Sequence, residues 1–152
     1  MKVFIIYWLP PLVWMLFIFP TNDALTVSST SHIIVPLLRW LFPNADPVTI
    51  DSFHILARKF IHFFEYALLA FLLFRAFRGK NKDWQMRWIL YAGVITIGYG
   101  SLDEFFQTLI PSRTGELSDW IIDVAGAVFA LCIITVFSSM KIKKLENKKI
   151  RK

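Results

Sequence analysis

The sequence predicts an all-α integral membrane protein, a bundle of four transmembrane helices that forms a single domain over residues 1–152. Three observations lead to this prediction. The chain is 56% hydrophobic and 16% aromatic, which is more apolar surface than a soluble domain of 152 residues can bury. It contains four long apolar runs. Its basic residues gather on alternate connections between those runs, as they do in membrane proteins of fixed orientation.

Each apolar run is about long enough to cross a bilayer. The runs cover Val3 to Phe19, Ile55 to Phe77, Trp88 to Ile110 and Trp120 to Phe137. Pro10 and Pro11 interrupt the first run, and we expect them to kink its helix. That run also fits a signal peptide, because Lys2 supplies a short basic region and Ser28 and Ser29 supply a weak cleavage site. It stays bulky to its end and lacks a clean A-x-A, so we expect a retained helix.

The connection after the first run predicts a short interfacial helix on the outer leaflet. Residues 28–31 are Ser and Thr, which cap helices well, and an apolar stripe follows them. This stripe consists of Ile33, Ile34, Leu37, Leu38 and Leu41. Pro43 and Pro47 are expected to end the helix.

The distribution of basic residues predicts the orientation. Thirteen of the seventeen lie at the N-terminus, in the segment from Arg75 to Arg87, or in the tail of residues 138–152. The exceptions are Arg39, Arg58, Lys59 and Arg113. Both termini should therefore be cytoplasmic, with the basic tail as a solvated, frayed extension. This placement favours anionic lipid contact over nucleic acid, for which the chain carries no motif. The single cysteine, Cys132, is predicted to pack inside the bundle.

This orientation brings polar residues from three separate stretches to one depth, just below the outer surface. The helical spacing places Arg58, His62 and Glu65 on one face, Asp103 with Gln107 on another, and Asp119 with Asp123 on a third. Lys59, Tyr66, Glu104 and Arg113 lie close to them in sequence. A charge inside the hydrocarbon costs about 2.5–3.5 kcal/mol on insertion scales, so such residues are functional by default. The alternative is that they form internal salt bridges that only hold helices together.

These residues also carry a family resemblance. The chain contains Arg58-Lys59-x-x-His62-x-x-Glu65-Tyr66, Asp103-Glu104-x-x-Gln107, Pro111-x-Arg113 and Asp119-x-x-x-Asp123-x-x-Gly126, in that order between hydrophobic helices. Over residues 56–136 it resembles the VanZ-like family of bacterial membrane proteins. The resemblance implies a multi-pass protein of the bacterial plasma membrane with a role in the cell envelope. It also implies a link to resistance against the glycopeptide teicoplanin, although no settled molecular activity comes with it.

Three functions fit the polar residues. In the first, Arg58, Lys59, Tyr66, Gln107 and Arg113 bind an anionic lipid headgroup, such as that of a lipid-linked envelope precursor. The catalytic candidates are His62, Glu65, Asp103, Glu104, Asp119 and Asp123. Of these, Asp103, Glu104, Asp119 and Asp123 could also hold a divalent cation. The second function is lipid transport or flipping, which would need a homo-oligomer because four helices are few. The third is a non-catalytic membrane factor whose charges are structural. The residues leave the cofactor, the reaction type and the enzymatic status open.

Overall fold

The computed structural model describes residues 2–19, 27–81, 84–109 and 117–150, and within them the secondary structure is entirely helical. There are five α-helices: α1 (Lys2–Phe17), α2 (Val27–Leu41), α3 (Pro47–Arg78), α4 (Met86–Thr108) and α5 (Leu117–Ile150). Helix α2 is the helix predicted between the first two apolar runs, and the other four contain the four predicted runs almost entirely. The all-α prediction is therefore confirmed.

Two helices are long and apolar enough to cross a membrane, namely α3 and the Leu117–Lys141 part of α5. Only 33% and 22% of their most apolar segments are buried inside the molecule. The core helix of a soluble protein would be mostly buried, so these helices turn apolar side chains outward, as helices in lipid do. The apolar part of α1, Phe4–Phe17, is shorter. In α4 the acidic pair Asp103 and Glu104 lowers the hydropathy of the last turns.

The ends of α3 follow from local chemistry. Asp46 caps the N-terminus through its Oδ1, which accepts a hydrogen bond from the Thr49 backbone N–H at 3.1 Å, and Pro47 occupies the first turn. The helix therefore begins at Pro47, well before the Ile55 at which the predicted span starts. Gly79 ends it with a φ of 54°, a conformation that favours glycine.

Two expectations from the sequence are wrong. The tail of residues 138–152 was predicted to be frayed, but α5 continues through its described part to Ile150. Its Lys-rich sequence has high helix propensity, so the helix continues past the apolar segment. Cys132 was predicted to pack inside the bundle, but it lies on the exposed face of α5.

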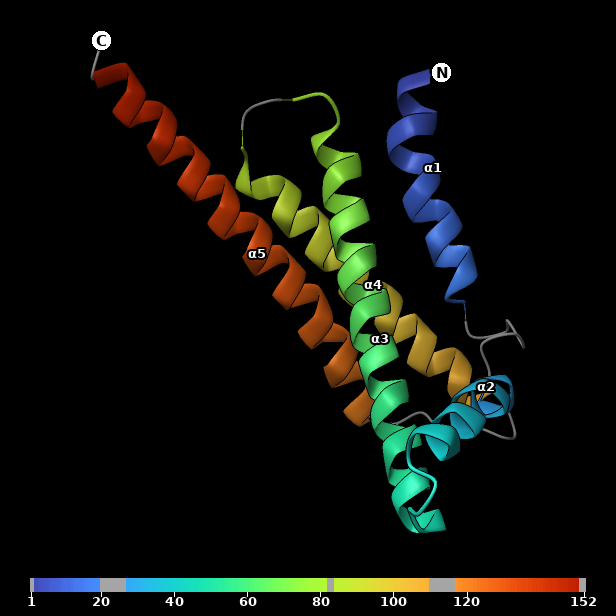
Figure 1. Cartoon of the computed structure of the whole chain (residues 1–152). Helices are drawn as coiled ribbons and strands as arrows, with labels where there is room; N and C mark the ends of the chain where they lie inside the picture. Colours follow the sequence, from blue (N-terminus) through green and yellow to red (C-terminus); the bar gives the residue numbers. More distant parts are fainter. Residues whose placement is uncertain (1, 20–26, 82–83, 110–116, 151–152) are drawn as a thin grey trace.

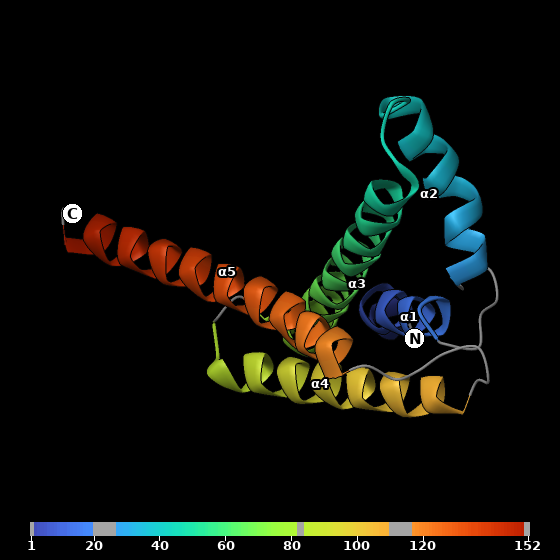
Figure 2. The same ribbon diagram turned by 90° about the horizontal axis from the view of Figure 1, so that it is seen from below.

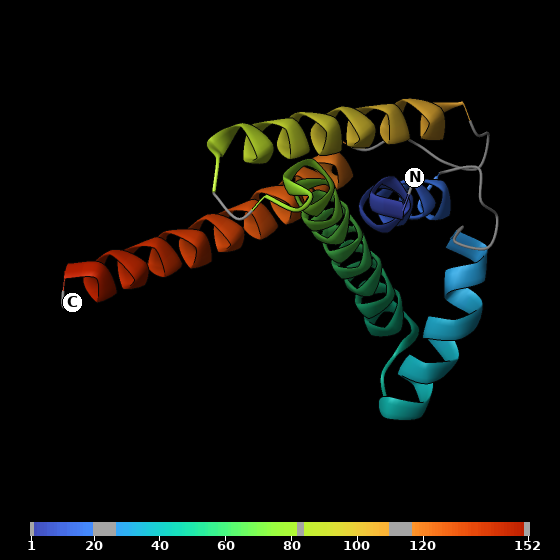
Figure 3. The same cartoon turned by 90° about the horizontal axis from the view of Figure 1, so that it is seen from above.

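Helices α3, α4 and α5 pack together around a shared core (Figure 1). The buried apolar side chains of this core include Tyr66, Leu69 and Phe74 from α3, Trp88 from α4 and Leu131 from α5. Helix α1 packs beside α3, on the side away from α5 (Figures 2 and 3). Its Trp14 Nε1 donates to the Glu65 carbonyl oxygen at 3.0 Å, and its Met15 carbonyl accepts from Tyr99 Oη at 2.6 Å.

The polarity of the bundle is clear in Figure 1. Helix α1 begins and α5 ends at the same end of the molecule, where α3 also turns into α4. Helix α2 packs against α3 at the opposite end, where the Phe42 and Phe53 rings lie 5.1 Å apart. The basic connection between α3 and α4 therefore lies at the same end of the bundle as both chain termini, and α2 lies at the other end.

Candidate functional site

A cluster of titratable side chains lies where α3, α4 and α5 meet. Ligand atoms of His62 (α3), Asp103 (α4) and Asp123 (α5) all lie within 4.8 Å of one another. Asp103 is five residues from the end of α4 and Asp123 is six residues from the start of α5, or about 8–9 Å along each helix. The structure thus brings together one side chain from each of the three predicted polar stretches, close to the end of the bundle that α2 occupies. We call these three residues the polar triad.

Asp123 is the most deeply buried member of the triad, with 1% of its surface exposed. His62 Nδ1 lies 3.5 Å from Asp123 Oδ1 and 4.0 Å from Glu65 Oε2. No hydrogen bond of good geometry reaches either Asp123 carboxylate oxygen from the residues that the structure describes. A buried carboxylate without such partners is costly, so its environment calls for a positive charge or a donor.

Asp103 is held in place by two neighbours. Its Oδ2 accepts a hydrogen bond from Tyr66 Oη at 3.0 Å and another from Gln107 Nε2 at 3.3 Å. All three residues are buried. The sequence predicts Tyr66 and Gln107 as ligand-binding residues. In the structure they donate hydrogen bonds to the Asp103 carboxylate and so orient it.

Two glycines allow the helices to come this close. A Cβ atom at Gly126 of α5 would clash with the Phe63 carbonyl oxygen of α3, so only glycine fits at this crossing. A Cβ atom at Gly100 of α4 would lie 3.2 Å from the Tyr66 ring and 3.7 Å from Asp123 Cβ. Small residues at helix contacts in membranes serve this purpose. Gly126 lies one turn after Asp123, and this close crossing therefore sets the distance from Asp123 to His62.

Lys59 and Asp119 form a separate pair nearer the end of the bundle. Their Nζ and Oδ1 atoms lie 3.2 Å apart, and Lys59 Nζ also lies 3.3 Å from Ser118 Oγ. Both side chains are partly exposed. Asp119 shares a helix face with Asp123 but lies one turn closer to the start of α5, and it does not belong to the triad. Of the four carboxylates predicted as metal ligands, Asp103 and Asp123 lie in the triad, whereas Asp119 and Glu104 do not.

The other candidates lie around the triad or outside the described residues. Arg58 is half-buried on α3, one turn before His62, and forms no ion pair or hydrogen bond with another described side chain. Glu65 and Glu104 are also half-buried. Arg113, which the sequence predicts as a phosphate ligand, lies outside the described residues.

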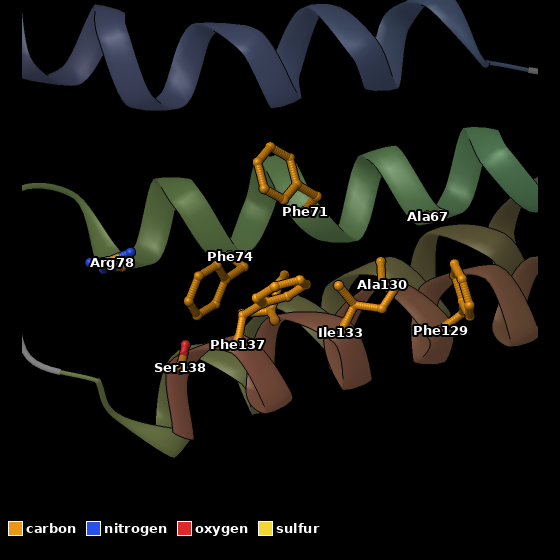
Figure 4. A pocket seen from close by; sticks show the side chains of 10 residues that line it. Ala67, Phe71, Phe74, Arg78, Phe129, Ala130, Ile133, Phe137 and Ser138 are labelled. Carbon is orange, nitrogen blue, oxygen red and sulfur yellow. The ribbon is translucent and has the colours of Figure 1, made fainter. Parts of the chain in front are cut away.

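Beyond the triad, toward the chain termini, the described core is apolar. It contains Leu69, Ala70 and Leu73 of α3, and the buried Thr96 hydroxyl is satisfied by the Ala92 carbonyl oxygen at 2.8 Å. An apolar groove of about 410 Å³ lies in this half between α3 and α5, lined by side chains such as Phe71, Phe137 and Arg78 (Figure 4). None of the candidate residues lines it. The described part of one chain therefore shows no polar path between the two ends of the bundle.

The triad can act on a cation or on a proton. An imidazole nitrogen and two carboxylates are ligands for divalent metal ions, and the same groups can relay protons. The sequence predicts His62 as a catalytic candidate but does not place it among the metal ligands. The sequence shows that His62 lies near Glu65, because the two residues are one helical turn apart. It cannot show that His62 lies near Asp123, because that contact depends on how α3 and α5 cross.

Comparison with known proteins identifies one family. The model of the VanZ/LLP1 family matches residues 4–138. This range runs from the first turn of α1, through α2, α3 and α4, to the start of the basic tail of α5. All the candidate residues fall within the matched range. No curated protein and no solved structure matches the chain significantly.

Proposed function

The chain belongs to the VanZ/LLP1 family. We propose that it is a multi-pass protein of the bacterial plasma membrane and that its polar triad is part of a functional site. The observation that carries the proposal is the burial of Asp123 against His62 inside a membrane protein. Each charge placed in hydrocarbon costs about 2.5–3.5 kcal/mol, so a cluster that only joined helices would be an expensive substitute for apolar packing.

The proposed topology has four spans, α1, α3, α4 and α5, with both termini in the cytoplasm and α2 on the outer leaflet. Two features support it. The basic residues cluster at the end of the bundle where α1 begins and α5 ends, in agreement with the positive-inside rule. The stripe of apolar residues on α2 includes Ile33 and Leu37, which are exposed as expected for a helix that lies in a membrane interface.

This topology predicts which positions a membrane-impermeant maleimide can reach. In a Cys132→Ser background, Asn44→Cys lies between α2 and α3 and should be labelled in intact cells. Asn81→Cys lies after α3 and should be labelled only after the cells are permeabilised. Both positions are exposed in the structure, so a difference in labelling would reflect the side of the membrane and not burial within the protein. The reverse pattern, or labelling of both positions in intact cells, would refute the topology.

The proposed ligand is the anionic headgroup of a lipid-linked envelope precursor in the outer leaflet. Arg58 supports this choice, because it is half-buried one turn from His62 and no described carboxylate neutralises it. A guanidinium at this depth can bind a phosphate through two parallel hydrogen bonds. Arg113 is the second proposed phosphate ligand. Glu65 and the carboxylates of the triad would then bind the polar remainder of the headgroup or act on it.

The headgroup proposal predicts the effect of removing one guanidinium. Purified protein in nanodiscs should bind a polyprenyl phosphate, and Arg58→Gln should weaken that binding about 10- to 100-fold, the loss expected for one charge-assisted hydrogen-bonded contact. Arg39→Gln is the control, because Arg39 is an exposed basic residue on α2, outside the cluster. Binding that is equally strong in both variants would contradict the proposal, and so would an equal loss in both.

The family resemblance adds a proposed cellular effect, namely protection against teicoplanin. In a sensitive bacterial host, the wild type should raise the inhibitory concentration, whereas Asp103→Asn and Asp123→Asn should not, because each removes one charge of the triad. Asp51→Asn, an exposed carboxylate at the start of α3, should protect like the wild type. Membrane levels are matched by immunoblot. Full protection by both triad variants would rule out the triad as the source of resistance.

A further inference from the structure

We propose that His62, Asp103 and Asp123 bind one divalent ion of the first transition row, of which Zn²⁺ is the best candidate. The ion would lie between α3, α4 and α5, with His62 Nδ1 and one oxygen from each carboxylate as ligands. This proposal concerns the triad itself and stands whether or not the protein binds a lipid headgroup.

The distances in the triad suit a small ion. Zn²⁺ forms bonds of about 2.0–2.2 Å to nitrogen and carboxylate oxygen, so two ligands of a tetrahedral site lie about 3.4 Å apart. His62 Nδ1 and Asp123 Oδ1 lie 3.5 Å apart. All three ligand atoms lie within 4.8 Å of one another, so the remaining contraction is within reach of side-chain rotation.

The burial of Asp123 is an independent observation that points to a ligand. Its carboxylate is 99% buried, and neither oxygen has a hydrogen bond of good geometry from the described residues. Other carboxylates lie on the three helices that form the triad: Glu65 on α3, Asp103 and Glu104 on α4, and Asp119 on α5. Lys59 is paired with Asp119, and among the described residues His62 is the only side chain able to carry a positive charge that lies within ion-pair distance of Asp123. A divalent ion would neutralise the two triad carboxylates together.

The ligand types narrow the choice of metal. Mg²⁺ and Ca²⁺ prefer sites made entirely of oxygen, whereas one imidazole with two carboxylates suits Zn²⁺, Mn²⁺ or Fe²⁺. Imidazole and carboxylate ligands, with one position left for a further ligand, are typical of Zn²⁺ sites in particular. Tyr66 and Gln107 would serve as the outer shell, because their hydrogen bonds fix the Asp103 carboxylate.

A site with three protein ligands leaves a coordination position open. Such sites are typical of metals that bind or activate a further ligand, whereas purely structural zinc sites use four protein ligands. A phosphate oxygen of the headgroup would be a suitable fourth ligand, and this part of the inference rests on the proposed function.

The experiment is a metal titration of the tag-free full-length protein in detergent micelles. After treatment with a chelator and desalting, calorimetry should show that the wild type binds about one Zn²⁺ per chain, as a preformed three-ligand site requires. Asp123→Asn and His62→Gln should each weaken binding at least 100-fold, beyond the ~10- to 100-fold loss seen for outer-shell changes. The matched controls Asp51→Asn and His32→Gln alter exposed residues and should bind like the wild type. Mg²⁺ should bind far more weakly to all of them.

The melting temperature provides a second readout. Zn²⁺ should raise the melting temperature of the wild type and of both controls, because it binds only the folded state, but not that of Asp123→Asn or His62→Gln. The proposal is overturned if the wild type binds no Zn²⁺ or if the triad variants bind it as tightly as the controls. The triad would then be an ion pair between a protonated His62 and Asp123. If Asp123→Asn does not fold, His62→Gln and the zinc-dependent shift of the wild type decide the question. Lipid binding by the chelator-treated wild type tests the headgroup proposal separately.

Discussion

The crossing of α5 over α3 controls the geometry of the whole polar region. At Gly126 the backbone of α5 comes so close to the Phe63 carbonyl oxygen that no side chain fits between them. One turn earlier on the same helix, this close contact carries the Asp123 carboxylate into the interior, to within 3.5 Å of His62 Nδ1. Helix α4 completes the arrangement with Asp103, and Gly100 gives the Tyr66 ring room to reach that carboxylate. Without the crossing, the three polar stretches would be separate.

The two halves of the bundle are built differently as a result. Toward the chain termini, the helices are joined by apolar packing of side chains such as Leu69, Leu73 and Leu131. Toward α2, the interior contains ionisable groups in positions that apolar packing could fill. Proteins often keep such costly arrangements where they bind or transform something. Many large apolar side chains of α3, and of α5 up to Met140, are exposed, in keeping with a bundle that is surrounded by lipid.

The sequence predicts the helices well, because apolar runs and helix-ending residues are local signals. It also predicts that Arg58, His62 and Glu65 share a face, since helical spacing determines this. It cannot separate Asp119 from Asp123, which lie on the same face one turn apart. Only the packing of the helices shows that the first pairs with Lys59 near the surface while the second is buried in the triad. For the same reason, the sequence does not show that Tyr66 and Gln107 hold Asp103, or that Cys132 faces outward.

The central claim is that the triad exists for a ligand and not for stability, and the stability of Asp123→Asn tests it most directly. The free energy of unfolding is measured in one detergent for chelator-treated wild type, Asp123→Asn and the control Asp51→Asn. A working site predicts that Asp123→Asn is as stable as the wild type within about 1 kcal/mol, or more stable, because the substitution relieves a buried charge that awaits its ligand. A loss of about 3–5 kcal/mol, the usual cost of breaking a buried ion pair, would contradict the account and make the triad a structural element.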